Sequence, residues 1–350
     1  MQKRLLVLAL FVAAAIAIPS SFAGDRGFAW QLTPTGSTAR LRGLSAVDAR
    51  TAWASGSLGT VLRTTDRGAT WEQVGPPGTE ALQFRDIEAF DATHAAVMSI
   101  GETTDAFRIY VTADAGRHWT LGFQNTDPTA FYDCMTFFDQ KRGLAISDPP
   151  SDGGKFRIIA TGDGGYSWHA VDPAGIPDAL PGEFAFAASG QCITTAHGHT
   201  AWFATGGAAQ ARVFRSTDRG QTWTVSGTPL RSGPSGGIFA LAFRDQRHGI
   251  AVGGDLATPE ASPDNFAVTS DGGRTWTLVA GPTEYRSGAT WVDGHTVIAV
   301  GPTGSDVSTD AGRTWTRFDS GTFDTTDCAS PVACWAAGAA GRVAYLVRSH

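Results

Sequence analysis

The sequence has no long run of basic residues and no excess of positive charge. Its 350 residues contain 27 lysines and arginines against 33 aspartates and glutamates, which gives a formal net charge of −6. Without Lys3 and Arg4, which lie in the leader described next, 25 basic residues face 33 acidic ones and the charge is −8. This acidic balance argues against nucleic acid and anionic lipid as partners.

Long apolar segments are also missing, except at the start. Lys3 and Arg4 precede an unbroken apolar run over 5–18, and Ser21-Phe22-Ala23 has the small-x-small pattern of a cleavage site. A run of this length is too short to span a bilayer comfortably, and we expect no stable membrane insertion. We therefore expect a signal peptide over 1–23, cleaved near Ala23, and a periplasmic or secreted chain.

Cysteine is rare and no C-x-x-C pair occurs, so the spacing fits no zinc site and we expect no metal. No phosphate loop or dinucleotide fingerprint is present, and we expect no cofactor. An even number of cysteines in an oxidising compartment favours disulfides. Cys328 and Cys334 flank a predicted turn at Ser330-Pro331, and we expect them to be bonded. A bond between Cys134 and Cys192 is left open.

Glycine and tryptophan are abundant, with 43 and 11 residues, a composition typical of tight turns and large packing anchors in all-β proteins. Six segments share the pattern Ser/Thr-x-Asp-x-Gly-x-Thr-Trp, with His118 and Ser167 as the departures at the seventh position. Their aspartates are Asp66, Asp114, Asp163, Asp218, Asp271 and Asp310. The closing tryptophans recur every 39 to 55 residues. A four-stranded propeller blade takes roughly 40–50 residues, which agrees with this period.

Each residue of the repeated box has a structural role in a turn. The aspartate can accept hydrogen bonds from the backbone N–H groups that follow it, and the glycine supplies a positive φ. The tryptophan starts the next strand and buries a large ring. Calcium loops gather several carboxylates in one loop, whereas each of these turns carries mostly one. We therefore interpret the six aspartates as structural.

Six boxes predict seven blades. After the last box, the segment 334–343 resembles 52–61, so a seventh blade begins without a fourth strand of its own. At the other end of the chain, 28–32 resembles the strand over 70–74 that follows the first box. We expect one domain over 24–350, an all-β seven-bladed propeller of four-stranded antiparallel blades, with the N-terminal strand closing the ring and removing its open edges.

In these boxes the chain resembles the BNR/Asp-box propellers of the photosystem II stability/assembly-factor type, over essentially the whole length after the leader. The resemblance implies an exported, non-catalytic seven-bladed scaffold that binds protein partners. Photosynthetic members of that family assist photosystem assembly, but only the fold is carried over here. Sialidases also use such propellers, but their Arg-Ile-Pro signature is absent from this sequence.

The candidate site lies on the face opposite the boxes, where the hairpins between second and third strands meet the connections between blades. Ligand sites favour such a channel mouth. The residues expected there, as a polar ring that binds an unknown protein or glycan, are Arg85, Asp86, Tyr132, Asp133, Asp148, Glu183, Arg212 and Asp255. As an alternative, paired carboxylates in the ring would suit a glycoside hydrolase or lyase. Some of the aspartates could instead only cap turns.

Overall fold

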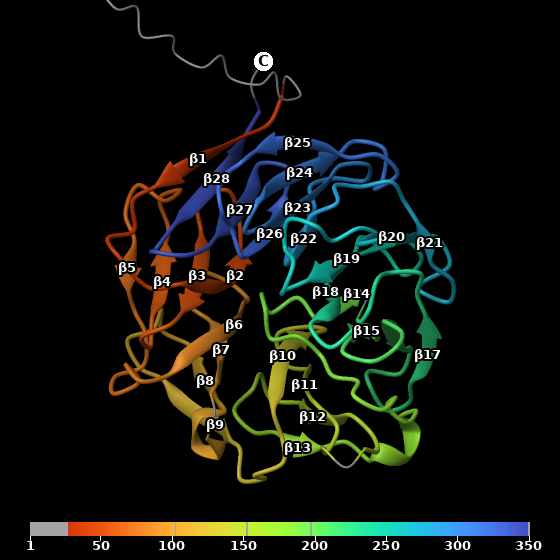
Figure 1. Ribbon diagram of the computed structural model, residues 1–350. Coiled ribbons are helices and arrows are strands. Elements are labelled where there is room, and N and C mark those ends of the chain that lie inside the picture. Colours follow the sequence, from red (N-terminus) through yellow and green to blue (C-terminus); the bar gives the residue numbers. More distant parts are fainter. Residues whose placement is uncertain (1–26, 102, 152, 197, 349–350) are drawn as a thin grey trace, which may run out of the picture.

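The computed structural model describes residues 27–101, 103–151, 153–196 and 198–348, so the expected leader over 1–23 lies outside the described residues. Within this part of the chain, 28 strands form seven sheets of four antiparallel strands. The sheets follow one another around a ring in chain order (Figure 1). Two single-turn 3-10 helices occur, η1 (Thr104–Ala106) and η2 (Pro173–Gly175). The expected all-β seven-bladed propeller is confirmed.

None of the helices in the described ranges is long and apolar enough to span a membrane.

The first three blades run outward from the central channel in chain order. Blade 1 consists of β2 (Leu41–Ala46), β3 (Ala52–Gly56), β4 (Val61–Thr64) and β5 (Glu72–Gln73). Blade 2 consists of β6 (Gln83–Ala89), β7 (Ala95–Ile100), β8 (Arg108–Thr112) and β9 (Thr120–Gln124). Blade 3 consists of β10 (Tyr132–Phe137), β11 (Gly143–Ser147), β12 (Arg157–Thr161) and β13 (His169–Ala170).

Blades 4 to 6 repeat this order, and blade 7 differs only in its outer strand. Blade 4 consists of β14 (Ile193–Ala196), β15 (Thr200–Ala204), β16 (Arg212–Ser216) and β17 (Thr224–Gly227). Blade 5 consists of β18 (Gly236–Phe243), β19 (Gly249–Asp255), β20 (Phe266–Thr269) and β21 (Thr277–Leu278). Blade 6 consists of β22 (Gly288–Trp291), β23 (Val297–Gly301), β24 (Gly304–Ser308) and β25 (Thr316–Asp319). Blade 7 combines β26 (Thr325–Ser330), β27 (Ala333–Ala337) and β28 (Val343–Val347) with β1 (Ala29–Thr33) from the other end of the chain.

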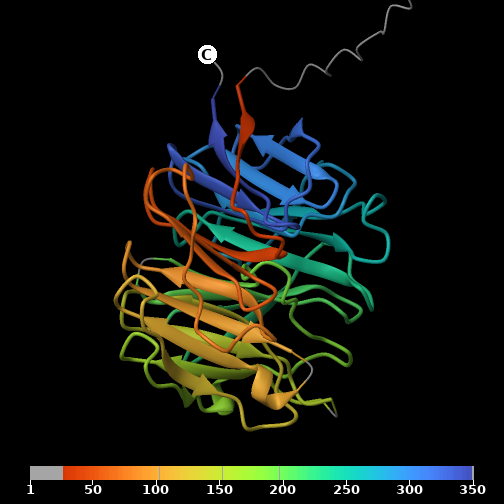
Figure 2. The same ribbon diagram turned by 90° about the vertical axis from the view of Figure 1, so that its left-hand side faces the viewer.

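Strand β1 closes the ring, as the sequence predicted. It pairs antiparallel with β28, from Ala29 opposite Val347 to Thr33 opposite Val343, and the two strands lie side by side in both views (Figure 2). Trp30 is 9% exposed, and its Nε1 donates to Ser305 Oγ of blade 6 at 3.0 Å. The closing strand therefore joins blade 7 and also packs against blade 6.

The repeated boxes form the turns between third and fourth strands. In the first box, Asp66 Oδ1 accepts from Thr70 N at 2.9 Å and Oδ2 from Thr70 Oγ1 at 2.6 Å. These hydrogen bonds from Thr70 lower the pKa of Asp66 to about 2. The glycine of every box has a positive φ, between +77° and +92°, a conformation that glycine adopts without strain. The box carboxylates are thus occupied within their own turns.

Both disulfides pin inner strands. Cys328 and Cys334 stand opposite each other in the β26–β27 pair with 4.0 Å between their Cα atoms, which is the expected bond. The second bond, which the sequence left open, joins Cys134 of β10 to Cys192 just before β14, with Cα atoms 6.0 Å apart. This buried bond fastens blade 3 to blade 4 next to the channel.

The antiparallel meander gives the ring two different faces. The box turns and the turns between first and second strands lie on one face, here called the box face. The hairpins between second and third strands and the connections between blades lie on the other, here called the mouth face. The first residues of every inner strand therefore reach the channel at the mouth face.

Candidate functional site

A cavity of about 230 Å³ lies at the channel mouth, and we call it the mouth pocket. Blades 1, 2, 5, 6 and 7 and the connection between blades 3 and 4 all contribute to it. Its lining consists of Arg40, Arg42, Arg85, Phe186, Ala187, Ala188, Phe239, Leu256, Pro259, Tyr285, Ser287, Pro302 and Asp324. Three arginines face a single aspartate, so the pocket carries two positive charges that no lining carboxylate balances.

The three arginines have different environments. Arg40 forms a bidentate pair with Asp324, with Nε–Oδ2 and Nη2–Oδ1 distances of 2.9 and 2.7 Å, and this hydrogen bonding raises its pKa. Arg42 Nε is buried without a hydrogen-bond partner among the described residues. Arg85 donates to two uncharged oxygens, the Ala187 carbonyl at 2.6 Å and Gln83 Oε1 at 3.3 Å. Burial and the neighbouring Arg42 and Arg40 lower the pKa of Arg85 to about 10. This guanidinium therefore has positive neighbours and no carboxylate that accepts a hydrogen bond from it among the described residues.

Local bulges place the pocket residues. The inner strands of blades 1, 2 and 5 each have a register shift early in the strand, at Arg42, Arg85 and Phe239 respectively. A bulge inserts one extra residue and redirects its side chain. All three bulged residues line the mouth pocket. Blade 3 has the same shift at Asp133, but this residue is not among the lining.

An aromatic cluster forms the apolar wall of the pocket. Phe186 stacks on Phe239 with ring centroids 3.8 Å apart, and Tyr285 meets Phe239 edge-on at 4.7 Å. Such contacts fix the rings in place beyond the burial of their area alone. The pocket is therefore preformed, with cations on one side and aromatic rings on the other.

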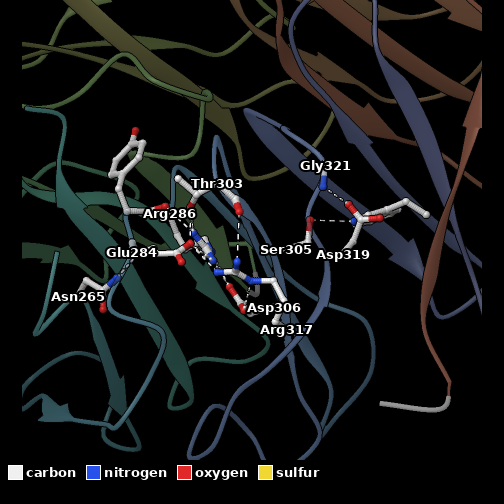
Figure 3. A network of polar contacts seen from close by, with 11 residues as sticks. Asn265, Glu284, Arg286, Thr303, Ser305, Asp306, Arg317, Asp319 and Gly321 are labelled. Carbon is white, nitrogen blue, oxygen red and sulfur yellow. Dashed lines mark hydrogen bonds and ion pairs between the residues drawn. The ribbon is translucent and has the colours of Figure 1, made fainter. Parts of the chain in front are cut away.

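An ionic network next to Tyr285 in the chain joins Glu284, Arg286, Asp306 and Arg317 (Figure 3). Arg286 is fully buried, and it donates to Asp306 Oδ2 at 2.6 Å and to the Tyr285 carbonyl at 2.8 Å. Glu284 accepts from Thr303 and from Arg317. Two arginines and two carboxylates thus balance within the network, as burial of charge requires. We assign this network a structural role in holding the loop that carries Tyr285.

Of the eight residues expected at the mouth, Arg85 alone lines the pocket. Asp86 lies deeper, beside a channel cavity of about 120 Å³ that Glu88 and Asp327 also line. Burial raises the pKa of Asp86 to about 7 and that of Asp327 to about 6. Asp86 Oδ2 accepts from Met135 N of blade 3 at 2.7 Å. This carboxyl therefore links two inner strands below the mouth.

Asp133 is buried, and the half-buried Asp148 of the same blade is its acidic neighbour. Burial, together with the neighbouring Asp148, raises the pKa of Asp133 well above its ordinary value, and burial raises that of Asp148 as well. Asp148 Oδ1 also accepts from Ala185 N at 2.8 Å. Oδ2 of Asp133 is buried without a hydrogen-bond partner among the described residues, and such burial favours the protonated form of a carboxyl. This arrangement differs from the pair separated by a cleft that glycoside hydrolysis uses.

The remaining four candidates do not converge on the pocket. Glu183 and Arg212 form a buried ion pair with an Nε–Oε1 distance of 2.8 Å, and Thr205 also donates to Glu183 at 2.6 Å. Tyr132 is 6% exposed and packs edge-on against Phe123. Asp255 accepts from Ala257 N of its own hairpin and from Ser235 Oγ of the connection before β18, and Arg231 Nη2 of that connection lies 3.6 Å from its Oδ2. The expected polar ring is therefore dispersed into separate structural contacts.

Sequence reasoning placed the loop over 183–189 at this face but missed Arg40, Arg42, Phe239, Tyr285 and Asp324. A signal for two of them was available. Aligning the blades on their inner strands puts Leu41-Arg42 level with Phe84-Arg85 and with Ile238-Phe239, which would have grouped the bulged residues. No three His, Cys, Asp or Glu side chains in the described ranges are grouped closely enough to hold a metal ion.

No family model and no curated protein matches this sequence. Among solved structures, it is similar to YCF48 bound to a D1 peptide, with 15% identity, TM-score 0.64, and coverage of 94% of this chain and 99% of that chain. It is also similar to YCF48 from Cyanidioschyzon merolae, with 17% sequence identity, a TM-score of 0.67, and coverage of 92% of this chain and 99% of that chain. A third similar structure is the GH74 enzyme of Niastella koreensis, with 14% sequence identity, a TM-score of 0.54, and coverage of 79% of this chain and 46% of that chain.

The match to YCF48, a photosystem II assembly factor, agrees with the resemblance that the boxes indicated. At identities of 14 to 17% such likenesses show the fold alone. The chain thus shares with YCF48 a seven-bladed propeller over nearly the whole length of both proteins.

Proposed function

We propose that this protein is an exported, non-catalytic scaffold that binds an acidic segment of a partner protein at the mouth pocket. The observation that carries the proposal is the pair Arg42 and Arg85, which is held at the channel mouth without a carboxylate partner. Guanidinium groups bind carboxylates in a bidentate way, with charge-assisted hydrogen bonds. An incoming carboxylate would supply the partner that these two arginines lack.

The size of the pocket favours part of a protein over a whole small molecule. Pockets for small ligands usually measure about 300–1,000 Å³, whereas the mouth pocket holds about 230 Å³. This space suits one or two side chains, or a chain end. The Phe186–Phe239–Tyr285 wall would contact the apolar atoms next to the acidic group. Leu256, which is 51% exposed at the rim, extends the apolar contact outward.

Two further observations support the proposal. A YCF48 propeller of the same fold has been solved bound to a D1 peptide, so a propeller of this architecture can hold a peptide. The leader pattern over 1–23 supports export to the periplasm or beyond. For the present chain we propose only the chemistry of the partner, a protein segment that carries a carboxylate. The proposal does not extend to a photosystem protein.

Partner capture with a double variant tests this function. Wild-type protein and R42Q/R85Q would be used as baits in periplasmic extract of the source cells. Each lost charge-assisted contact is worth about 1.5–3 kcal/mol, so we expect capture to fall by at least about tenfold. R108Q is the matched control, because Arg108 begins β8 at the same face but lies outside the pocket. Equal capture by R42Q/R85Q and wild type would contradict the proposal.

A further inference from the structure

A second groove lies on the box face, between blades 5 and 6. It consists of two cavities that share Arg244 and Trp291. The inner cavity, of about 630 Å³, reaches from the channel across the ends of β18 and β22. The outer cavity, of about 500 Å³, continues along β20 and β21 to the turn between β22 and β23. We call the two together the blade 5–6 groove.

All the titratable side chains that line the outer cavity are basic or neutral. They are Arg244, His248, His295 and Arg313. The nearby carboxylates are already engaged: Asp245 Oδ2 lies 2.8 Å from His248 Nδ1 and 3.4 Å from Arg244 Nε. Asp271 accepts from the Thr275 backbone and hydroxyl, at 3.0 and 2.7 Å. This part of an acidic protein therefore presents a surface that complements negative charge.

Trp291 forms a flat element at the junction of the two cavities. The Arg244 guanidinium lies 5.0 Å from the centre of its ring, and the indole Nε1 donates to the Ala242 carbonyl at 3.1 Å. A cation stacked on an indole is held in a defined orientation. Arg244 is thus positioned between the cavities, where one ligand could contact it from either side.

We propose that the blade 5–6 groove binds an acidic oligosaccharide, a sugar chain that carries carboxylates. The basic outer cavity would hold the carboxylates, and the indole and the hydroxyl-rich lining would contact sugar rings. The inner cavity is lined by Gln191, Thr194 and Thr290 and by the aspartates Asp245, Asp293 and Asp327. The carboxylates of the ligand would therefore lie in the outer cavity, and only uncharged parts of the sugar chain would extend into the inner one. An acidic peptide that binds by adding a strand to the sheet fits less well, because the outer strand β21 is only two residues long.

This site is independent of the proposed function, because the groove opens on the face opposite the mouth pocket. Titration calorimetry of the full secreted chain with tetrasaccharides would test it. The probes are tetragalacturonate and an alginate tetramer, with cellotetraose as the neutral sugar and tetraglutamate as the acidic peptide. We expect the acidic sugars to bind at least about tenfold more tightly than cellotetraose, because charge-assisted hydrogen bonds are lost with the neutral sugar.

Two variants locate the binding. R244Q and R313Q should each weaken tetragalacturonate binding by about tenfold or more. R117Q is the matched control, because Arg117 occupies the same box position in blade 2 as Arg313 in blade 6, and its affinity should equal that of wild type. The proposal is overturned if neither acidic sugar binds, if R313Q binds like R117Q, or if tetraglutamate binds as tightly as the sugars.

Discussion

A single residue position sets the chemistry of the channel mouth in several blades. The bulged residue of the inner strand is Arg42 in blade 1, Arg85 in blade 2 and Phe239 in blade 5. The corresponding Asp133 of blade 3 is 1% exposed and meets Asp148. Because the backbone geometry recurs, the side chain at this position decides whether a blade offers charge, an aromatic ring or an internal contact.

The carboxyl pair of blade 3 predicts an unusual dependence of stability on pH. Burial raises the pKa of both Asp133 and Asp148, so the native state holds a proton that the unfolded chain releases above pH about 4. The free energy of unfolding therefore falls as pH rises towards neutral and beyond. In D133N an amide can donate to Asp148, and we expect stabilisation by about 1–3 kcal/mol at pH 8, with a smaller effect at pH 5.

Urea unfolding at pH 5 and pH 8 measures this difference. D139N is the control from the same blade, because backbone N–H groups of Lys141 and Arg142 donate to Asp139 and hold its pKa below the ordinary value despite partial burial. Loss of this exposed cap should destabilise the protein modestly at both pH values. If the effect of D133N were the same at pH 5 and pH 8, the pKa of Asp133 would not be raised in the native state.

Among the elements, β1 is the strand that joins the two ends of the described chain in one blade. Without it, β28 would expose an unpaired edge and the ring would lose the bridge from Trp30 to blade 6. We expect deletion of residues 24–33 to lower the melting temperature sharply. The milder change W30A should lower the free energy of unfolding by about 3–5 kcal/mol, as alanine substitution does for other large buried aromatic residues.

Circular dichroism melts would test the role of β1 with a control from the same strand. Leu32 is 54% exposed, so L32A should change stability by no more than about 0.5 kcal/mol. If the deletion variant had the same melting temperature as the full chain, β1 would be a surface addition and the ring would be closed without it.

At the scale of strands and blades, the sequence predicted the fold well, but it predicted the residues of the mouth pocket poorly. Box spacing, blade number and ring closure depend on patterns that recur along the chain, and the structure agrees with them. A side chain that faces the channel differs from one that faces the core by a shift of one residue, and the bulges at Arg42, Arg85 and Asp133 produce such shifts. Glu183 and Arg212 were expected in the ring, but they pair with each other because a buried charge requires a partner.

The whole molecule combines an acidic composition with two local clusters of basic side chains. The mouth pocket holds Arg42 and Arg85, and the blade 5–6 groove holds Arg244 and Arg313. The two lie on opposite faces of a ring that β1 closes and that the Cys134–Cys192 bond fastens between blades 3 and 4. A closed ring with separate sites on its two faces is suited to holding partners in fixed positions, which agrees with the proposed scaffold role.

Site-specific photo-crosslinking in the source cells tests the central claim, that the partner binds at the mouth pocket. A photoreactive phenylalanine analogue would replace Leu256 at the rim of the pocket or, as the control, Leu278 on the outer strand of the same blade. Both positions are exposed, at 51% and 39%, so both should tolerate the change. We predict a crosslinked protein partner from position 256 that disappears in the R42Q/R85Q background, and none from position 278. A partner captured at 278 and not at 256 would contradict the account.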